Sequence, residues 1–369
     1  MQHLTHPLVS RSRASVKARW FAVLSASVLT CFLSLQASGL ELSPDDPHVG
    51  YVGRFTEDHR SAWSGSTVRL RFEGDSISAH LSVDAGKPVA FQVIVDGEAT
   101  DTLIVTPEQQ QYTLARDLPA GPHTVELFRR SEASFGPVTF HGFTLPDDAV
   151  LLDPPSRPRR LLLIGDSITC GYGNEATDLE QGNTVDNENA YLAFGPVAAR
   201  RFDADVVMAC FSGWGLYRGR SLEQDTQRTL PVVLDRAIPQ IPASTYDLRK
   251  DRPDVIVINL GTNDLFDAQG EKPALTREQY LGTYRAFIDR LHGLHPQAQI
   301  IAAIGPMRIQ PIDGWLEELA KEYPFVHDLV FEGYQGRSEE IAGHSHPSVQ
   351  GHQRMAETLI DTIQQITGW

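Results

Sequence analysis

Three short segments carry side chains that together can catalyse acyl transfer. Gly165-Asp166-Ser167 follows a run of aliphatic residues, Leu260-Gly261-Thr262-Asn263-Asp264 ends a second apolar run, and His346-Pro347 lies near the C-terminus. In that order they supply a hydroxyl nucleophile, an amide donor and an imidazole base. A serine hydroxyl is a poor nucleophile at neutral pH and needs a base within hydrogen-bond reach. We therefore predict that Ser167 is the nucleophile and that His346 is its base.

These residues also have ordinary structural interpretations. A serine at a helix start can be an N-cap, and an asparagine in a loop can cap local backbone groups. His344 and His352 compete with His346, and we interpret His352 as structural because it falls in the last predicted helix. Asp166 and Asp264 are predicted to hold their loops in shape rather than to touch a substrate.

The pattern around these segments predicts how they are positioned. Apolar runs alternate with helical stretches after residue 160, which is typical of a doubly wound parallel sheet. Ligands of such sheets bind at the carboxyl ends of the strands, where the segments of Ser167 and Asn263 begin. The His346 segment lies just before the last predicted helix. The predicted strands are Leu161–Ile164, Asp205–Ala209, Val255–Leu260 and Gln299–Ile304, and the predicted helices are Ala190–Arg201, Arg277–Leu294, Gly314–Glu322 and Val349–Thr367.

The preceding part of the chain follows a different pattern. Short alternating strands with turn signals recur from about residue 51 to residue 145, as in Thr67–Phe72, Ile77–Val83 and Phe91–Val95. Asp96-Gly97 is a strong hairpin turn. This pattern predicts an antiparallel β-sandwich over residues 40–147. Residues 148–159, rich in proline and charge, are predicted to be a linker to a domain over residues 160–369.

The first 39 residues have the composition of a signal peptide. They contain Arg11, Arg13, Lys17 and Arg19 and no acidic residue, followed by an apolar run from Trp20 to Leu35 and then by small residues. This arrangement predicts a Sec-type secretory signal with cleavage after Gly39, and therefore a secreted or periplasmic protein with no membrane attachment after cleavage. An uncleaved membrane anchor is the alternative, although the apolar run is short for a bilayer span.

The charge balance excludes some classes of partner. The chain has 369 residues and a net charge of −15, and its first 39 residues hold only basic charges. An acidic surface repels nucleic acid and anionic membranes, so neither is predicted as a partner. No cluster of Cys and His has zinc spacing, and no metal or other cofactor is predicted. Cys170 and Cys210 each follow a predicted strand, so they form either a disulfide in an exported protein or two buried thiols.

The three chemical segments together resemble the SGNH (GDSL) hydrolase superfamily. The run Gly-Asp-Ser-Ile-Thr-Cys-Gly-Tyr-Gly-Asn at residues 165–174 is similar to carbohydrate esterase family 2, which includes acetyl xylan esterases. That family joins an N-terminal β-sandwich to a C-terminal SGNH domain, and the resemblance covers nearly all of the chain after residue 39. It implies an α/β fold with a flavodoxin-like parallel sheet, preceded by a sandwich of jelly-roll type.

The resemblance also implies an oxyanion hole. Its donors would be the backbone N–H of Ser167, the backbone N–H of a glycine after the second strand, and the side-chain amide of Asn263. Gly213 is the favoured glycine and Gly215 the competing one. Aromatic residues near strand ends are candidate sugar platforms, although core packing is an equally good interpretation of each: Tyr172, Trp214, Tyr217 and Trp315.

The sequence departs from the superfamily at the acid of the triad. An aspartate usually stands three residues before the catalytic histidine, and Gly343 occupies that position. A backbone carbonyl can fix the imidazole tautomer in place of a carboxylate, and some members of carbohydrate esterase family 2 use a Ser-His dyad of this kind. A remote carboxylate from Asp328, Glu339 or Glu340 is the alternative.

The resemblance implies an esterase that removes O-acetyl groups from polysaccharides such as acetylated xylan or glucomannan. A lipase, a thioesterase or a peptidoglycan O-acetylesterase would use the same machinery, and a non-catalytic sugar-binding protein is an alternative of another class. The absence of a continuous apolar segment near Ser167 argues against a lipase. We expect the sandwich to support the active-site cleft rather than to bind sugar. The sequence leaves the oligomeric state open.

Overall fold

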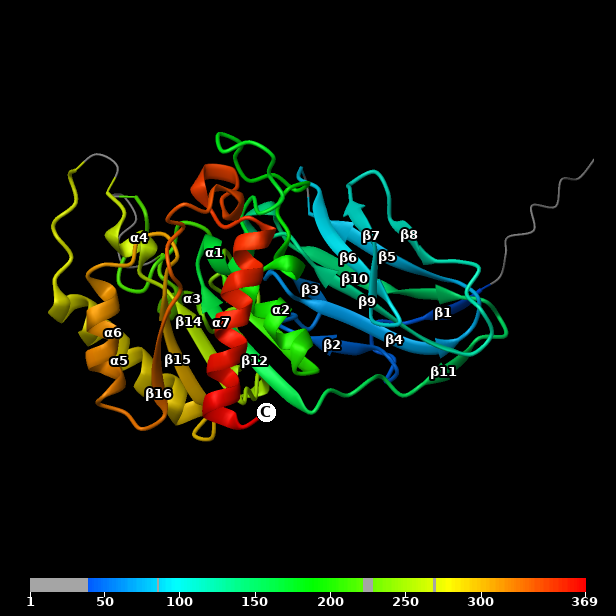
Figure 1. Cartoon of the computed structure of the whole chain (residues 1–369). Coiled ribbons are helices and arrows are strands. Elements are labelled where there is room, and N and C mark those ends of the chain that lie inside the picture. The colour runs from blue at the N-terminus through cyan, green and yellow to red at the C-terminus, as the bar shows by residue number, and fades with distance from the viewer. Residues whose placement is uncertain (1–38, 85, 222–227, 268–269) are drawn as a thin grey trace, which may run out of the picture. The chain divides into compact units, whose positions relative to one another are not determined.

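The computed structural model describes residues 39–84, 86–221, 228–267 and 270–369 (Figure 1). The predicted signal peptide lies outside these residues except for Gly39. Residues 39–369 form one compact unit. No helix within the described ranges is both long and apolar enough to cross a membrane.

The sheet of the C-terminal half is parallel, with the strand order β13-β12-β14-β15-β16. This is the order 2-1-3-4-5 of flavodoxin-like folds, so the predicted doubly wound sheet is confirmed. The strands are β12 (Arg159–Gly165), β13 (Ala204–Cys210), β14 (Val255–Asn259), β15 (Gln299–Ile304) and β16 (Val326–Val330).

Both faces of this sheet are buried because helices pack on each of them, and successive side chains of a strand enter opposite cores. Leu161 and Leu163 of β12 enter one core with helices α2 and α7, and Leu162 and Ile164 enter the other with α5 and α6. Figure 1 shows α7 in front of the sheet. The α-helices are α1 (Ser167–Cys170), α2 (Phe194–Arg201), α3 (Leu230–Val233), α4 (Thr262–Leu265), α5 (Arg277–Leu294), α6 (Ile312–Ala320) and α7 (Val349–Thr367). The 3₁₀ turns are η1 (Ala133–Phe135), η2 (Ala190–Leu192), η3 (Leu248–Lys250), η4 (Ser338–Glu340) and η5 (Gly343–Ser345).

Two antiparallel sheets precede this fold, which confirms the predicted β-sandwich. Alternating residues such as Leu70, Phe72 and Leu81 are buried between them. One sheet contains β1 (Leu40–Leu42), β3 (Arg60–Ser61), β5 (Ile77–Val83), β8 (Gln111–Ala115) and β10 (Val138–Leu145). The other contains β2 (Gly50–Val52), β4 (Thr67–Glu73), β6 (Val89–Val95), β7 (Glu98–Val105), β9 (Pro122–Arg129) and β11 (Val150–Leu152).

Some elements differ from the predictions. The segment predicted as a linker contains β11, which pairs with β4, because its proline and charge conceal a three-residue edge strand. The sequence did not predict β16, whose run Val-His-Asp-Leu-Val carries two polar residues. The helix predicted over residues 190–201 is interrupted by the extended backbone of Ala193 and forms η2 and α2.

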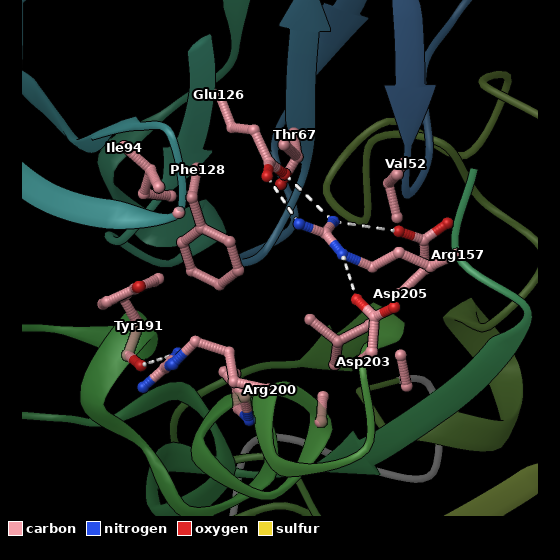
Figure 2. A pocket seen from close by; sticks show the side chains of 15 residues that line it. Val52, Thr67, Ile94, Glu126, Phe128, Arg157, Tyr191, Arg200, Asp203 and Asp205 are labelled. Atoms are coloured by element: carbon pink, nitrogen blue, oxygen red, sulfur yellow. Dashed lines mark hydrogen bonds and ion pairs between the residues drawn. The ribbon is translucent and has the colours of Figure 1, made fainter. Parts of the chain in front are cut away.

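The sandwich and the α/β region share a buried interface. Arg54 of the sandwich forms a fully buried ion pair with Asp251 at 2.8 Å, and the indole N–H of Trp63 donates to the carbonyl of Arg236 at 2.9 Å. A cavity of about 230 Å³ also lies at this interface. Figure 2 shows Arg157 at its edge, where the guanidinium bonds to Glu126 of β9 and Asp205 of β13.

Candidate active site

The predicted chemical residues meet in a second cavity, of about 360 Å³. It is lined by Ser167, Gly213, Asn263 and His346, together with Tyr172, Ser212, Arg220, Thr262, Phe266, Met307, Arg308, His344 and Ser345. These residues follow the carboxyl ends of β12, β13, β14 and β15 or lie in the loop before α7. The cavity of Figure 2 contains none of them. The sheet therefore gathers the site at the edge where α/β folds bind ligands.

Ser167 is the first residue of α1, and its hydroxyl bonds to His346. The distance from Ser167 Oγ to His346 Nε2 is 2.8 Å. The N-cap is Asp166, whose Oδ1 accepts from the Ile168 N–H at 3.0 Å. The N-cap interpretation of Ser167 is therefore wrong, because the preceding aspartate does the capping and leaves the serine hydroxyl available to the histidine.

The other ring nitrogen of His346 faces the backbone. Its Nδ1 lies 3.2 Å from the carbonyl oxygens of both Gly343 and His344. The turn that presents these carbonyls has His344 and Ser345 in the left-handed region, with φ of 49° and 63°, which is uncommon for residues other than glycine. Because a carbonyl only accepts hydrogen bonds, Nδ1 carries the hydrogen and Nε2 is left to accept from Ser167.

No carboxylate in the described ranges forms a hydrogen bond with the His346 ring. Asp328 and Glu339 are exposed, and Glu340 is buried in ion pairs with Arg337 and Arg354. At Gly343, a Cβ would lie 2.6 Å from the carbonyl oxygen of Gln181. The loop geometry thus leaves no room for an aspartate at the position where the superfamily normally has one.

The environment keeps His346 neutral at neutral pH. Burial lowers the pKa of His346 to about 4, and the nearby His344 and Arg220 add to this effect, while its hydrogen bonds to the two carbonyls oppose it. The Tyr172 ring stacks on the His346 ring with centroids 4.3 Å apart, and the Tyr172 hydroxyl bonds to Nδ1 of His344 at 3.0 Å. A neutral ring with a free Nε2 lone pair is the form that can accept a proton from serine.

Two backbone N–H groups border the cavity next to the serine. The N–H of Ser167 is among the first of α1, which have no acceptor within the helix. Gly213 lies in the turn after β13 with φ of 81°, and none of the described residues accepts from its N–H. Gly215 does not line the cavity; it is buried where an added Cβ would meet the carbonyl of Arg218 and the carboxylate of Asp264. Of the two competing glycines, the structure brings Gly213 to the serine.

The side-chain amide of Asn263 lines the cavity but already has two acceptors. Its Nδ2 donates to Asp166 Oδ2 at 3.1 Å and to the carbonyl of Trp214 at 3.0 Å. An amide nitrogen has two hydrogens. Asn263 can therefore donate to a developing oxyanion only by sharing or giving up one of these bonds.

The two aspartates of the motifs hold loops, as their sequence positions suggested. Asp264 accepts from the backbone N–H groups of Leu216, Tyr217 and Arg218 at 2.7–3.0 Å. Burial raises the pKa of Asp166 to about 7 and also raises the pKa of Asp264. These carboxylates fix the loops on which Ser167 and Gly213 lie.

A disulfide joins Cys170 of α1 to Cys210 of β13. Of the two possibilities left open by the sequence, the structure has the disulfide rather than two free thiols. His352 is fully buried in α7 and its Nδ1 accepts from the Phe194 N–H at 3.2 Å, so it stabilises packing, as interpreted from the sequence.

The four candidate aromatic platforms differ in whether they reach the active-site cavity. Tyr172 lines the cavity, whereas the others do not. Trp214 is 9% exposed and stacks on Phe211 at 4.1 Å, and Trp315 packs against Tyr280. Tyr217 is half-buried, and its backbone is fixed by Asp264. For Trp214 and Trp315 the core-packing interpretation fits.

Sequence reasoning missed three residues at the cavity edge. Phe266 lies three residues after Asn263, and the guanidinium carbons of Arg220 and Arg308 lie 4.5 and 4.8 Å from its ring centroid. The position of Phe266 beside the Asn263 motif was a usable signal. Neither arginine belongs to a motif, so no local pattern identified them.

Comparison with known proteins identifies the family of both parts of the chain. Residues 51–155 match the family model described as Carbohydrate esterase 2 N-terminal, and residues 163–354 match that of the GDSL-like Lipase/Acylhydrolase family. The chain is 31% identical over 334 residues to an acetylxylan esterase / glucomannan deacetylase of Cellvibrio japonicus. This alignment covers 83% of this chain and 86% of that protein. It is 33% identical over 343 residues to the cellulase/esterase CelE of Acetivibrio thermocellus, covering 88% of this chain but only 40% of CelE.

Solved structures agree with the sequence relatives. A family two carbohydrate esterase from Clostridium thermocellum in complex with cellohexaose superposes with a TM-score of 0.77 at 32% identity, covering 87% of this chain and 99% of that one. A family two carbohydrate esterase from Cellvibrio japonicus gives a TM-score of 0.79 at 26% identity, covering 90% and 99%. The chain belongs to carbohydrate esterase family 2, with an SGNH (GDSL) hydrolase fold following its N-terminal β-sandwich.

Proposed function

We propose that this protein is a secreted esterase that removes O-acetyl groups from polysaccharides such as acetylated xylan or glucomannan, with Ser167 as nucleophile. The observation that carries the proposal is the 2.8 Å contact between Ser167 Oγ and His346 Nε2 inside a cavity at the carboxyl edge of the sheet. A nucleophile in hydrogen-bond contact with an oriented base is the geometric signature of covalent acyl transfer.

The first half-reaction transfers the acetyl group to the enzyme. His346 Nε2 takes the proton of the Ser167 hydroxyl while Oγ attacks the ester carbonyl carbon. The negative charge of the tetrahedral intermediate falls on the former carbonyl oxygen, near the N–H groups of Ser167 and Gly213 and the amide of Asn263. Collapse breaks the bond to the sugar oxygen, which receives the proton from the His346 imidazolium and leaves as a hydroxyl.

The second half-reaction releases acetate. A water molecule gives a proton to His346 Nε2 and attacks the acetyl-Ser167 carbonyl, and collapse returns the proton to Ser167 Oγ. The backbone carbonyls of Gly343 and His344 keep the ring in the required tautomer throughout. They carry no formal charge, so they stabilise the imidazolium less than a carboxylate would.

The choice of an acetylated polysaccharide rests on the relatives and on the cavity. Two of the relatives are named for acetylxylan and glucomannan. The cavity lining includes hydroxyl, amide, imidazole and guanidinium groups that can form hydrogen bonds with a sugar. Tyr172 and Phe266 line the cavity and are therefore the aromatic candidates for packing against a sugar.

Export of the protein is supported by its first 39 residues and by the disulfide. Disulfides persist in oxidising compartments and are rare in the cytosol of ordinary cells, and Cys170 and Cys210 are joined. A polymeric substrate outside the cell is consistent with that location.

The test is an assay of residues 40–369 on acetylated xylan, acetylated glucomannan and a nitrophenyl ester of a long-chain fatty acid. We expect release of acetate from at least one polysaccharide and negligible hydrolysis of the long-chain ester. The Ser167→Ala variant serves as the background control. Hydrolysis of the long-chain ester without release of acetate from either polysaccharide would contradict this proposal and indicate a lipase.

A further inference from the structure

A segment of the sandwich enters the α/β region beside the active-site loops. It begins where β9 ends, at Arg129, and continues to the buried residue Glu132. The Arg129 guanidinium is fully buried and donates to the carbonyls of Ser61, Ser131, Glu132 and Gly136. These bonds fix the backbone of the segment, so Glu132 has a defined position at the domain interface.

The Glu132 carboxylate accepts a hydrogen bond from an active-site loop. Its Oε2 lies 2.8 Å from the backbone nitrogen of Ser212, and its Oε1 accepts from the Ser134 hydroxyl at 2.9 Å. The Glu132 N–H donates to Glu188 Oε2 at 2.9 Å. Glu132 is only 2% exposed, so water cannot readily replace it as the acceptor for Ser212.

Ser212 immediately precedes Gly213 in the turn that borders Ser167. Other bonds also hold that turn. The Phe211 N–H donates to the carbonyl of Gly165 at 3.1 Å, the Trp214 N–H donates to the carbonyl of Phe211 at 3.2 Å, and the Arg220 N–H donates to the carbonyl of Gly213 at 2.7 Å. The carbonyl of Trp214 accepts from the Asn263 amide at 3.0 Å. Gly213 has a positive φ and no side chain whose packing could fix the orientation of its N–H. The bond to Glu132 therefore anchors the residue immediately before the Gly213 N–H, while the bond from Arg220 holds the carbonyl that follows it.

We propose that Glu132, a residue of the sandwich, is a positioning residue for acyl transfer. Its carboxylate holds the turn at residues 211–214 so that the Gly213 N–H faces the reacting ester. The inference rests on the proposed function for its catalytic consequence. It gives the sandwich a specific role in the reaction, beyond lending general stability to the cleft. Burial raises the pKa of both Glu132 and Glu188, and the buried positive charge of Arg129 opposes this effect by favouring their ionised forms.

The test compares Glu132→Ala and Glu132→Gln with the wild type and with Asp251→Asn. Asp251→Asn is the matched control because it weakens a buried interface ion pair, Arg54–Asp251, that lies outside the active-site cavity. Loss of an oxyanion donor costs about 10²–10³ in kcat, and a loosened donor costs part of this. We expect kcat of Glu132→Ala to fall about 10–100-fold with little change in KM, and Glu132→Gln, which retains one acceptor oxygen, to recover most of the loss.

Two further measurements separate positioning from simple destabilisation. Affinity for a boronic acid that mimics the tetrahedral intermediate should fall in Glu132→Ala in parallel with kcat, whereas Asp251→Asn should bind it like the wild type. Hydrogen exchange of the amides of residues 211–216 should accelerate in Glu132→Ala, accelerate less in Glu132→Gln, and stay unchanged in Asp251→Asn. The exchange experiment reports on the turn even if the wild type hydrolyses no acetyl ester, a result that would contradict the proposed function alone. Unchanged exchange at this turn, or a kcat loss in Glu132→Ala no larger than in the control, would overturn the positioning role.

Discussion

His346 donates its Nδ1 hydrogen to the main-chain carbonyl of Gly343, at 3.2 Å, on the side of the ring opposite the serine. A carbonyl can orient the imidazole and fix its tautomer, but it contributes no negative charge to stabilise the imidazolium. The dyad therefore depends on geometry and on the neutral state of the ring.

The nucleophile is tested by Ser167→Ala. This change removes the attacking oxygen and leaves the cap of α1 intact, because Asp166 provides the cap. Hydrolysis of nitrophenyl acetate should fall by more than about a thousandfold, since losing the nucleophile of such an enzyme usually costs far more. The thermal unfolding temperature should stay close to that of the wild type. Residual activity above about a thousandth of the wild-type rate in a folded variant would require another nucleophile.

The amide of Asn263 is tested by Asn263→Ala. If Asn263 gives up the Trp214 carbonyl to bind the oxyanion, kcat should fall by about 10²–10³ with little change in KM. Asn259→Ala is the matched control: it removes another buried amide, one that bonds to the carbonyl of Gly305 outside the cavity, and should reduce stability more than kcat. A raised KM with unchanged kcat would assign Asn263 to substrate binding.

The dyad predicts that no single carboxylate is essential to the base. Asp328→Asn, Glu339→Gln and Glu340→Gln should each lower kcat by less than tenfold, whereas loss of a true triad acid costs about 10⁴. Glu340→Gln should also lower the unfolding temperature, because Glu340 is buried between two arginines. A 10³-fold loss of kcat in any folded variant of the three would contradict the dyad.

The reverse change, Gly343→Asp, should give no gain in activity. Gly343 has no left-handed φ, so the obstacle is crowding, because a Cβ would meet the carbonyl of Gln181 at 2.6 Å. We expect lower stability and lower kcat, measured by thermal unfolding and steady-state kinetics. Increased kcat would mean that the loop can move to admit a carboxylate.

The pH dependence follows from the environment of His346. Burial lowers the pKa of His346 to about 4, and the ring must be neutral to accept the serine proton. Activity should therefore be retained below pH 6.5, where an ordinary histidine becomes protonated, and be lost as the pH falls through about 4. The acid limb of kcat/KM on nitrophenyl acetate measures this value, with circular dichroism at each pH as the control for unfolding. An acid limb at pH 6.5 or above would indicate a charged partner for the ring.

The sequence predicted the parts of the fold that local pattern determines. The run at residues 161–164 is apolar on every position because β12 is buried on both faces, and such runs are readily recognised. Strand β16 is at the sheet edge and contains His327 and Asp328, so its pattern resembles a loop. The burial of Trp214 was equally undetectable, because a tryptophan after a strand can turn toward the core or the cavity.

The site was predictable where its residues belong to motifs. Ser167 and His346 were identified from sequence, and the structure brings them into contact. The link between Glu132 and Ser212 spans 80 positions of the chain and two sheets. Ser212 directly precedes the predicted glycine Gly213, but Glu132 belongs to no recognisable motif. Only the tertiary fold, which places the end of β9 beside the end of β13, brings them together.

The shared interface also bears on how the two halves can be inherited and how they unfold. Val52 and Trp63 of the sandwich complete one core of the α/β region, and Ile94 and Phe128 complete the other. Separating the halves would expose these apolar side chains on one partner and the matching cavities on the other. The sandwich is therefore not an interchangeable module, since a domain that took its place would have to supply apolar side chains that complete both hydrophobic cores. The protein should melt in a single cooperative transition, and its two halves are expected to have evolved as one unit.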